Sequence, residues 1–181
     1  MTSDNDIMYA VRDGNIDRLG ELFTRYHKRL YNYFIFNTRN THVSEDLVQE
    51  VFLRILKYRK SFRTNGSFST WLYSVARNVR NDRFAEKGPF TEQIDDNTGI
   101  ASTDPGPDEC LEYDESITLL KKALAKLPDD MRDIIVLSRY ENMKYRDIGT
   151  LLGCTEGAVK VRMYRAMKEL SKTYHSLDGE E

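Results

Sequence analysis

Apolar residues recur along this chain at the spacing of amphipathic helices, and the pattern predicts an all-α protein. Between residues 7 and 36 it predicts a helical stretch in two pieces, with a break near Gly14 and Asn15. The apolar stripe expected to form core comprises Leu19, Leu22, Phe23, Tyr26, Leu30, Tyr33 and Phe34. Residues 39–44 should form a turn, in which Ser44 or Thr41 caps the next helix with a side-chain oxygen.

Residues 46–84 predict two helices joined by a short polar loop around Gly66. The buried side of the first helix is expected to comprise Leu47, Val48, Val51, Phe52, Ile55 and Leu56. Its other side presents Asp46, Gln49, Glu50, Leu53, Arg54 and Lys57. The buried side of the second helix is expected to comprise Trp71, Leu72, Val75, Ala76 and Val79, with Ser67 or Ser69 as its cap.

The opposite side of this second helix interleaves aromatic and cationic residues. Tyr73, Arg77, Arg80, Asn81 and Phe84 follow it at helical spacing, with Asn78 and Arg83 on the flanks. Aromatic rings stack on bases and guanidinium groups meet phosphates, so such a stripe suits single-stranded nucleic acid. The alternative is a solvated amphipathic helix whose rings cover a neighbouring element. Taken alone, the helix favours this alternative.

The C-terminal third predicts four further helices, at residues 113–127, 129–140, 145–152 and 156–174. Gly153 supplies the positive φ that ends a helix at little cost, and Thr155 can cap the last helix. Two helices joined across the short turn Gly153-Cys154-Thr155 form a predicted helix-turn-helix.

The last helix divides into an inward and an outward side. Its inward residues are expected to be Val159, Met163, Ala166, Met167 and Leu170. Its outward stripe comprises Lys160, Val161, Tyr164, Arg165 and Lys168, with Arg162 between the two sides. Arg can donate to guanine O6 and N7, Lys can reach phosphate, and apolar side chains can touch thymine methyl groups. The stripe therefore suits a major groove.

The net charge of −2 conceals an uneven distribution. Residues 1–87 carry +5, residues 88–115 carry −9 with no Lys or Arg, and residues 116–181 carry +2. The segment 88–113 is rich in Gly, Pro, Ser, Thr, Asn and Asp, and it predicts an acidic flexible linker. Local basic surfaces can bind nucleic acid even when an acidic segment offsets them in the total.

Several classes of protein are disfavoured by what the sequence lacks. No apolar run approaches a membrane span, and the N-terminus has no signal-peptide pattern, so a cytoplasmic protein without membrane insertion is expected. Cys110 and Cys154 are isolated, which predicts neither a disulfide nor a metal site. No converging Asp, Glu, His or Cys cluster is predicted, so we expect no catalytic residues, no enzymatic activity and no cofactor.

Three motifs in order and spacing resemble region 2 of bacterial sigma factors, in the extracytoplasmic-function (ECF) group of the sigma-70 family. They are Ser44-Glu-Asp-Leu-Val-Gln-Glu-Val-Phe-Leu-Arg, Phe68-Ser-Thr-Trp-Leu-Tyr-Ser-Val-Ala-Arg-Asn and Asp82-Arg83. Three further motifs resemble region 4 of the same family. They are Leu127-Pro128, Tyr145-Arg-Asp-Ile-Gly and Leu152-Gly-Cys-Thr-Glu-Gly-Ala-Val-Lys-Val-Arg-Met-Tyr-Arg-Ala. The sequence departs from the family's usual pattern at Gly149 (usually Ala), Thr155 (Pro), Ala158 (Thr) and Val161 (Ser).

The resemblance implies a sigma region 2-like helical domain at residues 1–87, the linker at 88–113 and a region 4-like helix-turn-helix domain at 114–181. It implies a sigma factor that binds core RNA polymerase, through its β′ and β subunits, and directs promoter-specific transcription initiation. Promoter DNA and an anti-sigma factor are the other implied partners.

The same resemblance assigns residues to three contacts. The polymerase contact, on the β′ coiled coil, would comprise Asp46, Gln49, Glu50 and Leu53. The minus-ten contact would comprise Tyr73, Arg77, Asn78, Arg80, Arg83, Phe84 and Lys87. The minus-thirty-five contact would comprise Ala158, Lys160, Val161, Arg162, Tyr164, Arg165 and Lys168.

A stand-alone helix-turn-helix transcriptional regulator is the main alternative function. It accounts for the C-terminal half but leaves the polar side of residues 46–57 without a role. A DNA-modifying enzyme is the second alternative, and it lacks the converging metal ligands that such chemistry needs.

Overall fold

The computed structural model describes residues 2–63, 66–87 and 110–179, with the side chains of Lys87 and residues 110–115 excepted. The described residues form helices and connecting turns without a strand, which confirms the predicted all-α class. The chain divides into two compact units at residues 98 and 99. The predicted linker lies mostly outside the described residues, and α5 begins at Cys110, inside its predicted C-terminal end.

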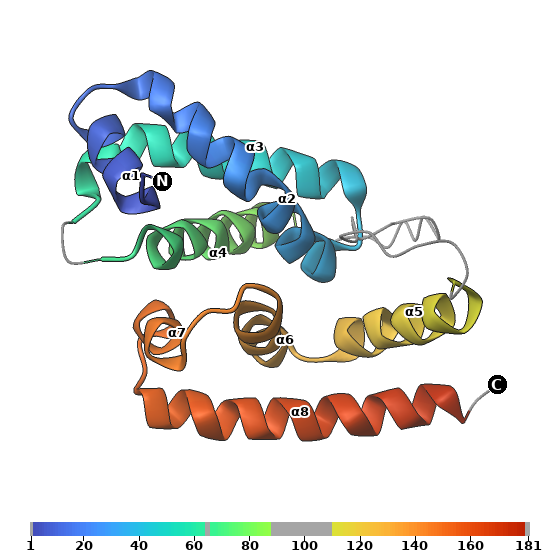
Figure 1. The fold of residues 1–181 in the computed structure, drawn as a ribbon. Helices are drawn as coiled ribbons and strands as arrows, with labels where there is room; N and C mark the ends of the chain where they lie inside the picture. Colours follow the sequence, from blue (N-terminus) through green and yellow to red (C-terminus); the bar gives the residue numbers. More distant parts are fainter. Residues whose placement is uncertain (1, 64–65, 88–109, 180–181) are drawn as a thin grey trace. The chain divides into compact units, whose positions relative to one another are not determined.

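The first unit consists of α1 (Asp4–Arg12), η1 (Ile16–Arg18), α2 (Leu19–Thr38), α3 (Thr41–Tyr58), η2 (Arg59–Ser61) and α4 (Phe68–Lys87). In Figure 1, α3 lies along α2 and packs on α4, and α1 packs beside the start of α4. The break predicted near Gly14 is present between α1 and η1. The core is built from the inward residues Ile7, Met8, Leu22, Leu30, Phe34, Val51, Ile55, Leu72 and Ala76.

The turn between α2 and α3 uses a different cap from the predicted one. Arg39 adopts a left-handed φ of 51° and ends α2, and the extended Asn40 then accepts a hydrogen bond from the Val43 amide at 3.0 Å. The N-cap is therefore Asn40, and the prediction of Ser44 or Thr41 was wrong. Ser44 is instead buried within α3, where its hydroxyl lies 2.7 Å from that of Thr38.

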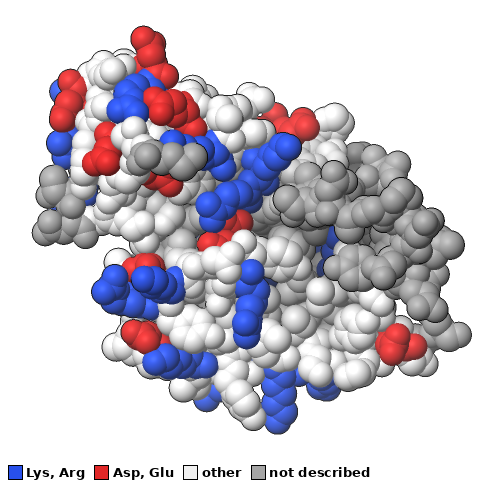
Figure 2. Space-filling model, in the orientation of Figure 1, with Lys and Arg blue, Asp and Glu red and all other residues white. Residues whose placement is uncertain are grey.

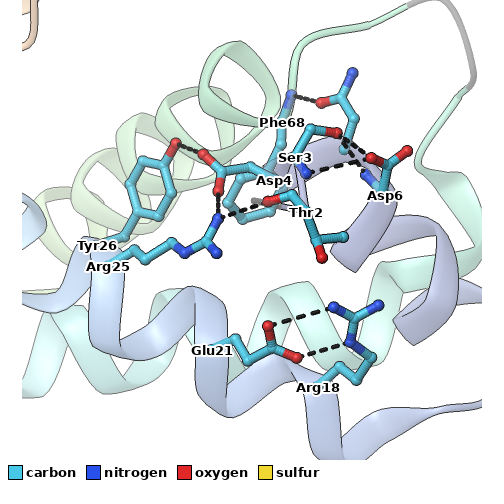
Figure 3. A network of polar contacts seen from close by, with 10 residues as sticks. Thr2, Ser3, Asp4, Asp6, Arg18, Glu21, Arg25, Tyr26 and Phe68 are labelled. Atoms are coloured by element: carbon cyan, nitrogen blue, oxygen red, sulfur yellow. Dashed lines mark hydrogen bonds and ion pairs between the residues drawn. The ribbon is translucent and has the colours of Figure 1, made fainter.

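The N-terminal segment is attached to the rest of the unit by polar contacts that span distant parts of the sequence. Figure 3 shows the Asp4 carboxylate accepting hydrogen bonds from Tyr26 and Arg25 of α2, at 2.6 and 2.5 Å. Ser3 and Asp6 form a capping box at the start of α1. The amide of Asn5 accepts from the Phe68 backbone N–H at 2.7 Å and donates to the Gly66 carbonyl at 3.0 Å. Asn5 thus fixes the start of α4, where the sequence predicted a local serine cap.

The second unit consists of α5 (Cys110–Lys126), α6 (Asp129–Ile135), the π-helical turn η3 (Val136–Tyr140), α7 (Tyr145–Leu152) and α8 (Glu156–Asp178). The long α8 runs beneath α5, α6 and α7 in Figure 1, and all three pack on it. The helix predicted over residues 129–140 therefore changes to π geometry at Val136.

A buried arginine connects α5 to α6. The guanidinium of Arg132 donates to the carbonyls of Leu124, Ala125 and Leu127 at 3.0, 2.9 and 2.6 Å, and to the Asp129 carboxylate at 3.0 Å. The last carbonyls of a helix have no partner within the helix, so this cation supplies hydrogen bonds where the helix dipole is negative. Arg132 is not among the core residues predicted from the sequence.

Two predicted core residues are more than one-third exposed. Phe23 is 41% exposed and stacks on His27 at a ring distance of 5.2 Å, while Met167 on α8 is 37% exposed. Both lie at the edge of an otherwise correct apolar stripe. A helix that packs on one side buries a limited arc, so residues at the margin of that arc remain accessible.

Replacing Asn5 with alanine tests the attachment of α1 to α4. Asn5→Ala removes two hydrogen bonds and leaves the first amide of α4 without its side-chain acceptor, so we expect the free energy of unfolding to fall by about 1–2 kcal/mol. Urea denaturation followed by circular dichroism measures it. Asn15→Ala, at an exposed cap without a side-chain hydrogen bond, is the control. Equal effects of the two changes would contradict the bridging role of Asn5.

Candidate functional site

The outward face of α3 presents polar residues around an exposed leucine. Asp46 and Gln49 are exposed, Glu50 is half-buried, and Leu53 between them is 61% exposed. The four side chains share one side of the helix because Gln49, Glu50 and Leu53 lie three, four and seven residues after Asp46. The structure therefore brings together the residues predicted for the polymerase contact. An exposed leucine within a polar face is a feature of protein interfaces, where an apolar centre is rimmed by polar groups.

Glu50 is held by an arginine that also binds α4. Arg54 Nε lies 2.7 Å from Glu50 Oε1, and its Nη1 lies 2.5 Å from Asp82 Oδ2. These hydrogen bonds, first with Asp82 and then with Glu50, raise the pKa of Arg54. The sequence placed Arg54 on the outward face without recognising that it connects α3 to α4.

The stripe predicted on α4 is not an exposed face. Tyr73 is 1% exposed and Arg80 is 3% exposed. Arg80 Nη1 donates to Asn37 Oδ1 at 2.9 Å and to the Tyr33 hydroxyl at 3.3 Å, both on α2. Tyr73 packs edge-on against the ring of Tyr33, with centroids 5.5 Å apart. The prediction of exposure was wrong for these two residues, because α4 turns them toward α2 and leaves Trp71 and Val75 only half-buried.

Other residues of the predicted minus-ten contact remain accessible. Asn78 is exposed, and Arg77, Arg83 and Phe84 are half-buried. The side chain of Lys87 lies outside the described residues. The accessible part of α4 therefore carries two arginines, an amide and one aromatic ring, and it is narrower than the sequence predicted.

The helix-turn-helix has the predicted form, with a close approach at Gly149. Gly153 ends α7 at a φ of 65°, and the Thr155 hydroxyl accepts from the Ala158 amide at 3.2 Å. A Cβ atom added at Gly149 would lie 2.7 Å from the carbonyl oxygen of Cys154. The glycine that departs from the usual alanine thus allows α7 to approach the turn more closely than alanine would.

The outward side of α8 matches the prediction closely. The exposed residues are Lys160, Val161, Arg162, Tyr164, Arg165 and Lys168, with Tyr164 the most exposed at 72%. Ala158 is half-buried. On the face drawn in Figure 2, Lys and Arg side chains with a few acidic groups are scattered over the part formed by α7 and α8, between larger areas of uncharged surface. The buried residues Val159, Met163, Ala166 and Leu170 attach α8 to its unit, so the cationic side faces outward.

An ion pair at the start of α8 was missed by the sequence analysis. Lys160 Nζ lies 2.8 Å from Glu156 Oε1, one helical turn apart. This hydrogen bond lowers the pKa of Glu156 and raises the pKa of Lys160. The four-residue spacing of the two opposite charges was the signal that could have identified it.

The described residues contain neither a candidate metal site nor a helix that could span a membrane. Among them, no group of His, Cys, Asp and Glu side chains could hold a metal ion. Cys154 is a free, half-buried thiol in the turn before α8. None of the helices in the described ranges is both long enough and apolar enough to cross a membrane.

Comparison with known proteins gives two family matches, Sigma-70 region 2 over residues 22–89 and Sigma-70 region 4 over residues 117–170. The ECF RNA polymerase sigma factor SigW of Bacillus subtilis (strain 168) is 30% identical over 176 residues, which cover 92% of this chain and 94% of SigW. A stand-alone helix-turn-helix regulator would not account for the region 2 match.

The solved structures that resemble the chain include two complexes. CnrH, in complex with the cytosolic domain of CnrY, superposes with a TM-score of 0.73 at 20% identity, covering 97% of this chain and 99% of CnrH, and this likeness concerns the fold. The sigma factor RpoE of Bartonella quintana, in complex with the anti-sigma factor NepR, gives a TM-score of 0.66 at 25% identity, covering 85% and 94%.

Replacing Arg80 and Asn78 separately tests which side of α4 is structural. Arg80→Ala removes the two hydrogen bonds that Arg80 donates to the buried Tyr33 hydroxyl and Asn37 amide, so we expect the free energy of unfolding to fall by about 2–4 kcal/mol. Asn78→Ala, two residues away but exposed, should change it by no more than about 0.5 kcal/mol. Thermal and urea melts of the full chain measure both. Similar small effects would mean that Arg80 is not needed to hold α4 on α2.

Proposed function

Because this chain belongs to the ECF group of sigma-70-type RNA polymerase sigma factors, we propose that α3, α4 and α8 each supply one contact of the initiating complex. The chain binds core RNA polymerase and directs promoter-specific transcription initiation. The family likeness extends over 92% of the chain, and this is the observation that carries the function. The residues that make each contact are inferred from burial, charge and position.

We assign polymerase binding to the outward face of α3. Leu53 is an apolar side chain that is mostly exposed in the free unit, and Asp46 and Gln49 beside it are also exposed. Covering Leu53 would remove apolar surface from water, and the carboxylates of Asp46 and Glu50 would select a basic partner surface. In this proposal the partner surface is the β′ coiled coil of the polymerase.

We assign minus-ten DNA to the accessible part of α4. Asn78 can hydrogen-bond to a base edge, Arg77 and Arg83 can meet phosphates, and Phe84 can stack on a base. Lys87 completes the contact in this proposal. Tyr73 and Arg80 act from the interior, by fixing α4 on α2, and they are not proposed to touch DNA.

We assign the minus-thirty-five element to α8. Its first turns present Lys160 and Val161, followed by Tyr164 and Arg165, while Lys168 lies further along the same exposed side. In helix-turn-helix proteins the second helix lies in the major groove. Arg can donate to guanine O6 and N7 there, whereas Lys can reach phosphate. Arg165 is therefore proposed to read bases, and Lys168 to meet phosphate.

An anti-sigma factor is the proposed regulatory partner. The structure of RpoE, which is 25% identical to this chain, is a complex with the anti-sigma factor NepR. In this chain the first unit exposes Phe23, Leu53 and Tyr58, apolar side chains that a protein partner could cover. A partner that covers Leu53 would exclude the polymerase from α3.

Charge reversal at Asp46 tests the polymerase contact. Asp46→Lys should abolish binding of core RNA polymerase and run-off transcription, because a cation would then face the basic partner surface. The free energy of unfolding should change by no more than about 0.5 kcal/mol, since Asp46 is an exposed surface residue. Asp17→Lys, an equal charge change at another exposed position of the first unit, is the control. Wild-type polymerase affinity in Asp46→Lys would refute the assignment.

Two substitutions on α8 separate base reading from phosphate contact. Arg165→Ala should weaken promoter binding by about 1–3 kcal/mol and relax specificity at one or two upstream base pairs. Lys168→Ala should weaken binding to all sequences alike and reduce the salt slope by roughly one unit. Binding of the polymerase complex to promoter variants, measured over a range of salt concentrations, distinguishes them. An unchanged promoter preference in Arg165→Ala would mean that α8 docks differently.

A further inference from the structure

The first residue of α8 is a carboxylate placed among cations on the side proposed to face DNA. Glu156 follows the cap Thr155, accepts a hydrogen bond from Lys160 at 2.8 Å, and is nearly half-exposed. The charge of Arg146, on α7, also acts on Glu156 and adds to the lowering of its pKa. Between residues 156 and 168 it is the only acid on the helix.

Among residues 155–158, at the N-terminal end of the helix, Glu156 has the longest side chain. Gly157 has no side chain, and Ala158 is small and half-buried. The Thr155 hydroxyl is occupied by the Ala158 amide. If the N-terminal end of α8 enters the major groove, the exposed side chains that can reach base edges in its first two turns are Glu156, Lys160, Val161 and Arg162.

The chemistry of the groove restricts what a carboxylate can meet there. Phosphates repel it, and it can only accept hydrogen bonds, so it needs a donor on a base edge. The cytosine N4 amino group is the donor that Asp and Glu accept from. Adenine offers its N6 amino group beside the acceptor N7, an arrangement that suits the amide of Asn or Gln better than a carboxylate.

We propose that Glu156 determines specificity, by accepting a hydrogen bond from the N4 amino group of one cytosine in the upstream promoter element. This inference rests on the proposed function of α8. On that element the Glu156 carboxylate releases Lys160 and accepts a hydrogen bond from the cytosine instead. Lys160 can then bind a phosphate. On other sequences Glu156 stays paired with Lys160 and reduces non-specific attraction to the DNA backbone.

The inference predicts which base is selected and how the selection changes. The full chain with core RNA polymerase is used to select from duplex fragments with a randomised upstream element, and bound fragments are sequenced. The wild type should enrich cytosine about tenfold at one position. Glu156→Gln should shift that position toward adenine, because glutamine pairs with adenine N6 and N7. Glu156→Ala should leave the four bases equally represented there, and positions read by Arg165 should not change.

A matched control removes the same charge elsewhere on the helix. Glu169 lies about 20 Å from Glu156 along α8, so the variant Glu169→Gln should retain the cytosine preference. On a duplex without the element, Glu156→Gln should bind more tightly and show a salt slope steeper by roughly one unit, because Lys160 is released. Thermal melts establish that each variant is folded.

Three results would overturn the inference. Retention of the cytosine preference in both Glu156 variants would mean that no base is read by this carboxylate. A steeper salt slope without a changed base preference would reduce its role to charge screening. Loss of preference at every position in Glu156→Gln would make it a positioning residue for α8. Absence of any upstream preference in the wild type would instead refute the proposed function of α8, which separates the two failures.

Discussion

Unpaired backbone groups at helix ends are the constraint on which both units depend. Each short helix leaves amides and carbonyls without intrahelical partners, and burying them unsatisfied is costly. In this chain the partners are side chains, several of them from another helix: Asn40 caps α3, Asn5 of α1 binds the first amide of α4, and Arg132 of α6 binds the Leu124 and Ala125 carbonyls at the end of α5. These contacts specify where α3 and α4 begin and how α6 meets α5. The helices that carry the proposed contacts are therefore held at their ends as well as by their apolar sides.

The helices and most of their buried sides could be predicted from sequence because their apolar spacing is regular. The long-range caps could not. Asn5 lies 63 residues from Phe68, and nothing in the spacing of either segment indicates that they meet. Asn40 could have been recognised as the N-cap of α3, since Asn caps helices as well as Ser does. The prediction chose Ser44 or Thr41 because it placed the first residue of the helix too late in the sequence. Local signals predict the existence of a helix better than the residue at which it begins.

The error on α4 arose from treating arginine and tyrosine as outward residues. Arg80 is buried because its guanidinium finds the Tyr33 hydroxyl and the Asn37 amide, with Cζ 5.8 Å from the Tyr33 ring centroid. A buried cation is tolerated only where such partners exist, and they come from a helix more than 40 residues away in sequence. On α8 the same assumption succeeded, because its buried side comprises small and apolar residues that leave the cations in water. Cations are therefore buried on α4 and exposed on α8 because the two helices have different neighbours. The spacing of residues within a helix does not predict those neighbours.

Charged residues on two of the proposed contact surfaces already have partners in the free protein. Glu50 is paired with Arg54, which also binds Asp82, and Lys160 is paired with Glu156. A partner that needs one of these charges must offer contacts that outweigh the existing pair. Since the pairs are partly exposed, each contributes little to stability, but each lowers the attraction of the surface to a wrong partner more than to a complementary one. Each pair thereby reduces the affinity of its surface for a partner that offers only general charge. The affinity is retained for a partner whose geometry satisfies both residues of the pair. For a protein that must find one promoter element among many phosphates, such internal pairing favours specificity over general binding strength.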